Sequence, residues 1–257
     1  MILQVIDYVG ALTLGYCNTL GTFVLFLYTA LYTLLTTKLK LKKVFAQMEH
    51  VGVNSLAIVM LTGLFTGAVL AFQSYIGFKR FGAEGFIGPV VALSLTRELG
   101  PVLTGLMVTG RAGSAMTAEI GTMRITEQID ALETLRLNVF QYLITPRLIA
   151  STIILPFLAL FTMLLGIIGG YIISTQVLGL NGVQFIKGIQ RYVELSDVTN
   201  GLIKSAAFGL ILSWVGSYKG YYAHGGARGV GISTTQSVVI SSIMILIANY
   251  FLTAILF

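Results

Sequence analysis

Charged residues are scarce in this sequence: only 10% of its 257 residues are Asp, Glu, Lys or Arg, while 56% are hydrophobic. Soluble domains usually carry about a quarter charged residues. The mean hydropathy of +0.88 is correspondingly high. The apolar runs are long and do not alternate with polar residues, so they indicate membrane helices rather than membrane strands. These features predict an all-α integral membrane protein.

Cysteine and histidine are nearly absent. Because Cys17 is the single cysteine, a disulfide framework or a cysteine-ligated metal site is excluded within one chain. The two histidines, His50 and His224, lie far apart in the sequence. Neither has the spacing of a metal ligand or of a base beside a nucleophile. We therefore expect no metal site and no catalytic residue, and an intramembrane enzyme has little support.

A nucleotide-binding motif is also missing. No stretch matches GxxxxGK followed by Ser or Thr, since Lys204-Ser205 lacks the preceding glycine. The glycine-rich residues 220–231 are predicted to form a short cytoplasmic loop rather than a phosphate cradle, because no strand precedes them. No cofactor is expected in this chain, and any ATP must be bound by a partner subunit.

The net charge of +6 raises the possibility of nucleic-acid binding. The basic residues border apolar runs instead of forming a patch with interleaved aromatic residues, so we expect no nucleic-acid partner. In membrane proteins such residues mark the cytoplasmic side. The most basic run, residues 38–50 (KLKLKKVFAQMEH), is therefore predicted to be cytoplasmic and to act as a topology anchor rather than a lipid-recognition site.

Five apolar segments after residue 50 can each span a bilayer, which takes about 20 residues. They cover residues 52–78, 86–110, 148–173, 198–218 and 232–257. This order puts the C-terminus outside, together with residues 79–84 and with residues 174–197, where a short helix is expected near residues 183–193. The earlier apolar run, residues 8–37, contains many threonines, so it either spans the membrane or lies in the headgroup layer.

Two glycine pairs with a four-residue spacing occur in the predicted spans. Gly63 and Gly67 permit a close helix approach, either within the chain or with a second copy. Gly166 and Gly170 are expected to be bending or packing points.

Three charged residues are embedded in predicted spans. Arg97 and Glu98 lie next to the helix-disturbing Pro101, and Lys204 lies in the span at residues 198–218. A charge at that depth costs about 2.5–3.5 kcal/mol, so such residues face a protein interior or a water-filled cavity. Two interpretations of Arg97 and Glu98 remain open: an ion pair that locks the helix break, or a role on a substrate pathway.

An amphipathic segment follows the second of these spans. If residues 122–136 form one helix, an apolar side and an acidic side result. The apolar side holds Ile125, Ile129, Leu132 and Leu135, and the acidic side holds Glu127, Asp130 and Glu133. A cytoplasmic helix of this kind is well suited to pass force to a soluble partner.

Residues 97–135 (RELGPVLTGLMVTGRAGSAMTAEIGTMRITEQIDALETL), followed by Pro146-Arg147 and an apolar helix, resemble the signature of the MlaE/YrbE permease family. Residues 197–209 (DVTNGLIKSAAFG) and 225–242 (GGARGVGISTTQSVVISS) are similar to that family too. The resemblance covers the chain from about residue 50 onward, whereas the first fifty residues match mainly in character. Members of this family are the membrane subunits of MCE-type ABC transporters.

The resemblance implies a non-catalytic permease subunit in the bacterial inner membrane that moves glycerophospholipids between the inner and outer membranes. The expected partners are a dimer of cytoplasmic ABC ATPase subunits, a periplasmic MCE-domain (MlaD-like) protein and a second copy of the chain. The implied fold is one permease domain, residues 1–257. It comprises an N-terminal interfacial (elbow) helix within residues 1–50 and five transmembrane helices within residues 51–257, with a cytoplasmic coupling helix near residues 122–136.

The resemblance also implies site residues. The contacts with the ATPase are expected at Glu127, Asp130, Ala131, Leu132 and Glu133, and the lipid cavity is expected at Arg97, Glu98, Lys204 and Asn249. Some relatives are expected to carry an acid near Asn249, so either Glu98 replaces an acid–Lys204 contact here or the contact is absent. The alternative is an ion-coupled secondary lipid transporter with Glu98 and Lys204 as relay groups, although no internal repeat supports it.

Overall fold

The computed structural model describes residues 2–37 and 39–257, with side chains from residue 13 onward except that of residue 16. Lys38, the first residue of the predicted basic run, lies outside the described residues. Within this part of the chain all regular elements are helices and none is a strand. The α-helices are α1 Ile2–Thr36, α2 Leu41–Gly52, α3 Leu56–Lys79, α4 Ile87–Ser94, α5 Gly100–Val108, α6 Ser114–Ile125, α7 Gln128–Thr134, α8 Thr145–Ile172, α9 Gly182–Tyr192, α10 Leu195–Tyr221 and α11 Gly226–Leu256.

Short turns of other helical types join these elements. Two 3-10 turns, Val53–Ser55 and Glu84–Phe86, begin α3 and α4. Four π-helical turns lie within or next to the long helices: Leu95–Leu99, Thr109–Gly113, Phe140–Ile144 and Ile173–Val177. Such turns insert one extra residue into a helix and re-aim the side chains around it.

Six stretches of the described chain are long and apolar enough to cross a membrane. They are Thr13–Thr36, Leu41–Lys79, Glu84–Ile125, Phe140–Val177, Leu195–Tyr221 and Gly226–Leu256. The last five correspond to the five predicted spans, so the prediction of an all-α integral membrane protein is confirmed. Length and composition do not distinguish α1 from these five, and its arrangement in space is informative instead.

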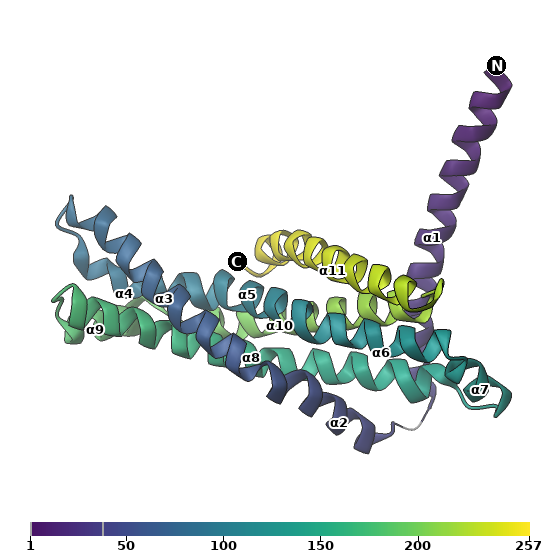
Figure 1. The fold of residues 1–257 in the computed structure, drawn as a ribbon. Helices are drawn as coiled ribbons and strands as arrows, with labels where there is room; N and C mark the ends of the chain where they lie inside the picture. The colour runs from purple at the N-terminus through teal and green to yellow at the C-terminus, as the bar shows by residue number, and fades with distance from the viewer. Residues whose placement is uncertain (1, 38) are drawn as a thin grey trace.

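The helix α1 leaves the bundle steeply near the end that carries α7, whereas α3 to α11 run roughly along one long axis (Figure 1). Only the C-terminal half of α1 is tied to the bundle. The Phe23 ring stacks on Trp214 at 4.0 Å, and Trp214 Nε1 donates a hydrogen bond of 3.1 Å to the Phe23 carbonyl. A helix set across the spans in this way has the arrangement expected of an elbow in the headgroup layer.

The two ends of the bundle carry the predicted loops in the expected grouping. The helix α9 and the connection between α3 and α4 lie at one end, and α7 lies at the other (Figure 1). The helix expected near residues 183–193 is present as α9, Gly182–Tyr192. Asn181 caps it, since its side chain accepts hydrogen bonds from the backbone N–H groups of Val183 and Gln184.

Three predicted boundaries were wrong. The span expected at residues 86–110 continues to Ile125, because Arg111 is accommodated within the protein and donates hydrogen bonds of 2.8 Å to Ser55 Oγ and 3.0 Å to the His50 carbonyl. The span expected at residues 148–173 runs over Phe140–Val177. In residues 220–231, only residues 222–225 are outside helices, because Gly225 and Gly226 with positive φ make a sharp turn into α11.

The helices α3 and α8 cross in close backbone contact. A Cβ atom on Gly67 would collide with the Gly166 backbone, and one on Gly63 would lie 2.6 Å from the Thr162 carbonyl oxygen. The two predicted glycine pairs therefore serve packing within one chain. This crossing fixes α3 against the centre of the bundle, beside the π turn that carries Arg97 and Glu98.

Candidate functional site

The first part of the site begins at the π turn Leu95–Leu99, which delivers Arg97 and Glu98 between α10 and α11. Pro101 follows it in the first turn of α5. Proline has no N–H to donate to the carbonyl four residues earlier. That carbonyl belongs to Arg97, and it accepts a hydrogen bond of 2.9 Å from Lys204 Nζ. The helix disturbance thus creates an acceptor for the charge embedded in α10.

Glu98 is the centre of a polar cluster, defined here as Glu98, Lys204, Asn249 and Thr253. Lys204 Nζ donates a hydrogen bond of 2.7 Å to Glu98 Oε1, and Asn249 Nδ2 donates one of 2.9 Å to Glu98 Oε2. Lys204 Nζ also lies 2.7 Å from Thr253 Oγ1. The Lys204 side chain is 0% exposed, whereas that of Glu98 is 35% exposed. An ammonium buried in this way must be neutralised within the protein, and Glu98 does so.

Three of the four predicted cavity residues therefore come together: Glu98, Lys204 and Asn249. The neutral amide at Asn249 does not abolish the acid–lysine contact, because Glu98 supplies the acid and Asn249 holds its second oxygen. The position of Thr253 one helical turn after Asn249 was the available sequence signal for the missing member of the cluster.

Arg97 does not pair with Glu98, and the interpretation of the two as an ion pair was wrong. Arg97 Nε donates instead to Asp197 Oδ1 at 2.7 Å. Asp197 is buried at the start of α10, where it forms a capping box with Glu194. Sequence analysis missed Asp197, although an acid in the first turn of a helix is a known capping signal. The Arg97 side chain remains 43% exposed and is available for another contact.

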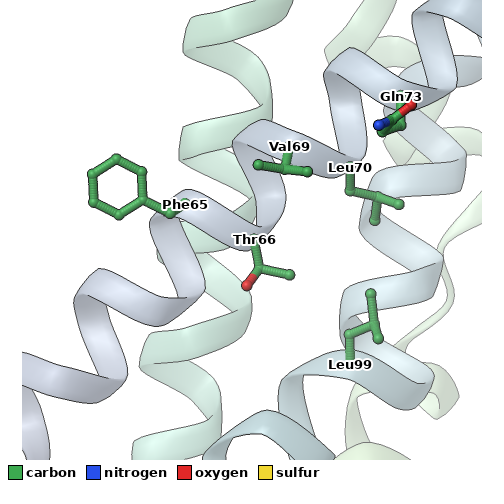
Figure 2. A pocket seen from close by; sticks show the side chains of 6 residues that line it. All are labelled: Phe65, Thr66, Val69, Leu70, Gln73 and Leu99. Atoms are coloured by element: carbon green, nitrogen blue, oxygen red, sulfur yellow. The ribbon is translucent and has the colours of Figure 1, made fainter.

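An apolar groove of about 370 Å³ adjoins this cluster along α3 (Figure 2). It is lined by Phe65, Thr66, Val69, Leu70, Gln73 and Leu99. Leu99 follows Glu98 in the chain, so the π turn presents an apolar side chain to the groove and a carboxylate to the cluster. A second apolar groove of about 430 Å³ lies between α10 and α11 near Phe251 and Leu252. Neither groove is lined by Arg97, Glu98, Lys204 or Asn249 themselves.

The second part of the site is the tip formed by α7 at the opposite end of the bundle (Figure 1). The single helix expected at residues 122–136 is broken, because α6 ends at Ile125 and Glu127 adopts a left-handed conformation with φ of 61°. A left-handed residue in this position reverses the chain direction between two helices. A second such residue, Arg136 with φ of 55°, ends the tip.

Internal contacts hold the tip in place. Arg124 Nη1 donates to Asp130 Oδ1 at 2.6 Å, and Tyr221 OH donates to Glu133 Oε1 at 3.2 Å. Ile129 is fully buried and anchors α7 to the core. The short helix is therefore mechanically joined to α6 and to the end of α10.

The outer surface of the tip is exposed and mixes acidic with apolar residues. Glu127, Asp130, Ala131 and Glu133 are exposed, and Leu132 is half-buried. Leu135, predicted to share the inward apolar side, lies after the end of α7 and is 69% exposed. The tip thus offers carboxylates and an uncovered leucine side by side, which is the composition of a protein-docking surface.

Comparison with known proteins yields one consistent result. The family model described as "Permease MlaE" matches residues 44–255. A probable ABC transporter permease protein of Rickettsia typhi is 46% identical over 257 residues, covering 100% of this chain and 99% of that protein. The Haemophilus influenzae intermembrane phospholipid transport system permease protein MlaE is 37% identical, covering 100% of this chain and 99% of that protein. The chloroplastic TRIGALACTOSYLDIACYLGLYCEROL 1 protein of Arabidopsis thaliana is 39% identical, with 87% of this chain and 64% of that protein covered.

Proposed function

The chain belongs to the MlaE permease family, and from this premise we propose that it is the membrane subunit through which an ABC transporter moves phospholipids between membranes. The observation that carries the proposal is the 37% identity to the Haemophilus influenzae permease named for intermembrane phospholipid transport, which extends over both chains almost from end to end. As a permease subunit the chain is non-catalytic, and a separate ATPase subunit hydrolyses ATP.

The lipid pathway of this proposal follows the groove along α3. Its lining is apolar apart from Thr66 and Gln73, which suits an acyl chain. The polar cluster beside Leu99 gives the groove a charged neighbour, and Arg97 is the exposed cation there. A phosphate head group would pair with Arg97 through charge-assisted hydrogen bonds. The buried Lys204 would act indirectly, because it holds Glu98 and the π turn in place.

The ATPase contact of this proposal is the α7 tip. Exposed Glu127, Asp130, Ala131 and Glu133 would meet the partner, together with the half-buried Leu132. Closure of an ATPase dimer would push α7, and the contacts of Arg124 and Tyr221 would transmit the movement to α6 and α10. The α7 end is then cytoplasmic in the inner membrane, α1 is the interfacial elbow, and the C-terminus is periplasmic beside an MCE-domain partner. A second copy of the chain would complete the lipid cavity.

The first test is copurification of the tagged chain from its native membrane, with mass spectrometry of the bound proteins and lipids. An ATPase, an MCE-domain protein and phospholipid in one peak is the expected result. A chain that stays without ATPase under mild conditions, and that moves lipid under a pH gradient alone, would contradict the proposal and favour the ion-coupled relay.

The docking role of α7 is tested separately with Glu127→Lys. Lysine and glutamate are both unbranched at Cβ, so the left-handed backbone is no more strained in the variant, and Glu127 forms none of the four ion pairs of the described residues. Loss of ATPase copurification with normal membrane insertion is expected. Asp130→Asn is the matched control for the Arg124 pair, since it removes that pair without placing a positive charge on the tip. Normal ATPase recovery with Glu127→Lys would remove α7 as the contact.

A further inference from the structure

A groove separate from the transport pathway lies between α2, α6 and the start of α8. It has a volume of about 280 Å³ and includes Lys43, Gln47, Glu119, Tyr142 and Arg147 in its lining. On α2, residues 43, 46 and 47 share one face because they are three and four positions apart. The groove therefore sits where the basic helix that precedes α3 meets the body of the protein.

Two ammonium groups converge at this groove without a carboxylate partner. Lys43 Nζ lies 2.7 Å from the centre of the Tyr142 ring, and Lys40 Nζ lies 4.4 Å from it. Neither lysine belongs to any of the four ion pairs found among the described residues. Two like charges held over one ring repel each other, and an anion between them would remove that cost.

The base of the groove adds a buried cation. Arg147 is 3% exposed, and its guanidinium donates to Glu119 Oε2 at 2.9 Å and to the Leu143 carbonyl at 2.8 Å. Its Nε is buried and has no hydrogen-bond partner among the described residues. Glu119 offsets the charge of Arg147, so the two lysines remain as an excess of positive charge.

The position of α2 identifies the kind of anion. The 24 residues of α3 are enough to cross the hydrocarbon layer, so α2 lies at its edge, on the side of the bundle where α7 is found (Figure 1). Leu41 and Phe45 of α2 are one turn apart and are 60% and 66% exposed. A helix with exposed apolar residues next to lysines lies at the level of lipid head groups. Free phosphate would make no use of Leu41 and Phe45, whereas the acyl chains of a lipid would cover them.

We propose that Lys40, Lys43, Tyr142 and Arg147 form a site for the phosphate group of an anionic phospholipid in the leaflet on the α7 side. The phosphate lies between the two ammonium groups, and the acyl chains extend past Leu41 and Phe45. The site holds a resident lipid that fastens α2 to α8 and does not lie on the groove along α3. It therefore stands or falls independently of the transport proposal.

Native mass spectrometry of the full chain in detergent tests the site with two lipids of identical acyl chains, phosphatidylglycerol and phosphatidylcholine. The wild type is expected to retain phosphatidylglycerol preferentially. The double variant Lys40→Ala/Lys43→Ala is expected to bind it on the order of twentyfold more weakly. Lys42→Ala is the matched control, because this exposed lysine belongs to the same helix and is absent from the groove. Its binding should change by no more than about twofold.

Two further arms separate the alternatives. Lys43→Arg keeps the charge and is expected to retain the lipid, which shows that loss in the alanine variant does not come from misfolding. Inorganic phosphate at millimolar concentration is expected not to displace phosphatidylglycerol. Equal loss of lipid in Lys42→Ala, equal retention of both lipids by the wild type, or full displacement by inorganic phosphate would each overturn the proposal.

Discussion

Glu98 and Lys204, which are 106 positions apart in the sequence, form a 2.7 Å ion pair in which the ammonium is completely buried and the carboxylate is not. The asymmetry decides what each residue contributes. Lys204 is held by Glu98, by Thr253 and by the Arg97 carbonyl. Glu98 faces outward in part and is held by Asn249 and Thr253 as well. The pair joins the middle of the second long span to α10, and α11 closes around it.

Glu98→Gln is expected to destabilise the protein strongly, because it leaves the buried ammonium of Lys204 without a counter-charge. Removing one partner of a buried pair costs about 3 kcal/mol at the lower end of the usual range, and this end applies since Glu98 is 35% exposed. Lys204→Met should cost less, because Glu98 keeps Asn249 and its exposure. In the Lys204→Met background, Glu98→Gln should have little further effect. Thermal unfolding of the four proteins in detergent measures this coupling, and equal costs of Glu98→Gln in both backgrounds would contradict it.

Asp197→Ala is expected to cost more stability than Asp197→Asn. The carboxylate accepts from Arg97 Nε and, through its second oxygen, from the Glu194 backbone N–H at 3.0 Å. Asparagine keeps one acceptor, whereas alanine loses both the ion pair and the capping box. The loss of a cap alone is worth about 1 kcal/mol. Thermal unfolding of the two variants checks the order, and identical midpoints would show that neither interaction contributes.

The sequence was informative where one helix decides its own fate. The five spans, the cap at Asn181 and the exposed acids of the α7 tip follow from local composition and spacing. The partners of Arg97 and Glu98 did not follow, because each lies about a hundred positions away on α10 and no local rule pairs Arg97 with Asp197 rather than with Glu98. The break at Glu127 was missed for a different reason: helical periodicity continues across it, and a non-glycine residue with positive φ leaves no compositional mark.

Gly67→Ala is expected to destabilise the crossing of α3 and α8. The added methyl group would meet the backbone of Gly166, which cannot move aside as a flexible side chain would. Overpacking of this kind costs about 1–3 kcal/mol. Gly77→Ala is the control on the same helix, because a Cβ atom there meets nothing within 4 Å, and alanine is the better helix former. Thermal unfolding should therefore shift down for Gly67→Ala and stay level or rise for Gly77→Ala.

Leu70→Trp is expected to reduce the phospholipid that copurifies with the complex while leaving the ATPase bound. The larger ring would occupy part of the 370 Å³ groove, in which Leu70 lies opposite Leu99 (Figure 2). The α7 tip is at the far end of the bundle from α9, so a change in this groove should not reach the partner contact. Ile58→Trp is the matched control, since Ile58 is on the same helix, is 41% exposed and does not line the groove. Mass spectrometry of lipid and ATPase in the purified complex measures both quantities. Unchanged lipid with Leu70→Trp would exclude this groove from the pathway, whereas equal loss with Ile58→Trp would show that tryptophan anywhere on α3 disturbs the complex.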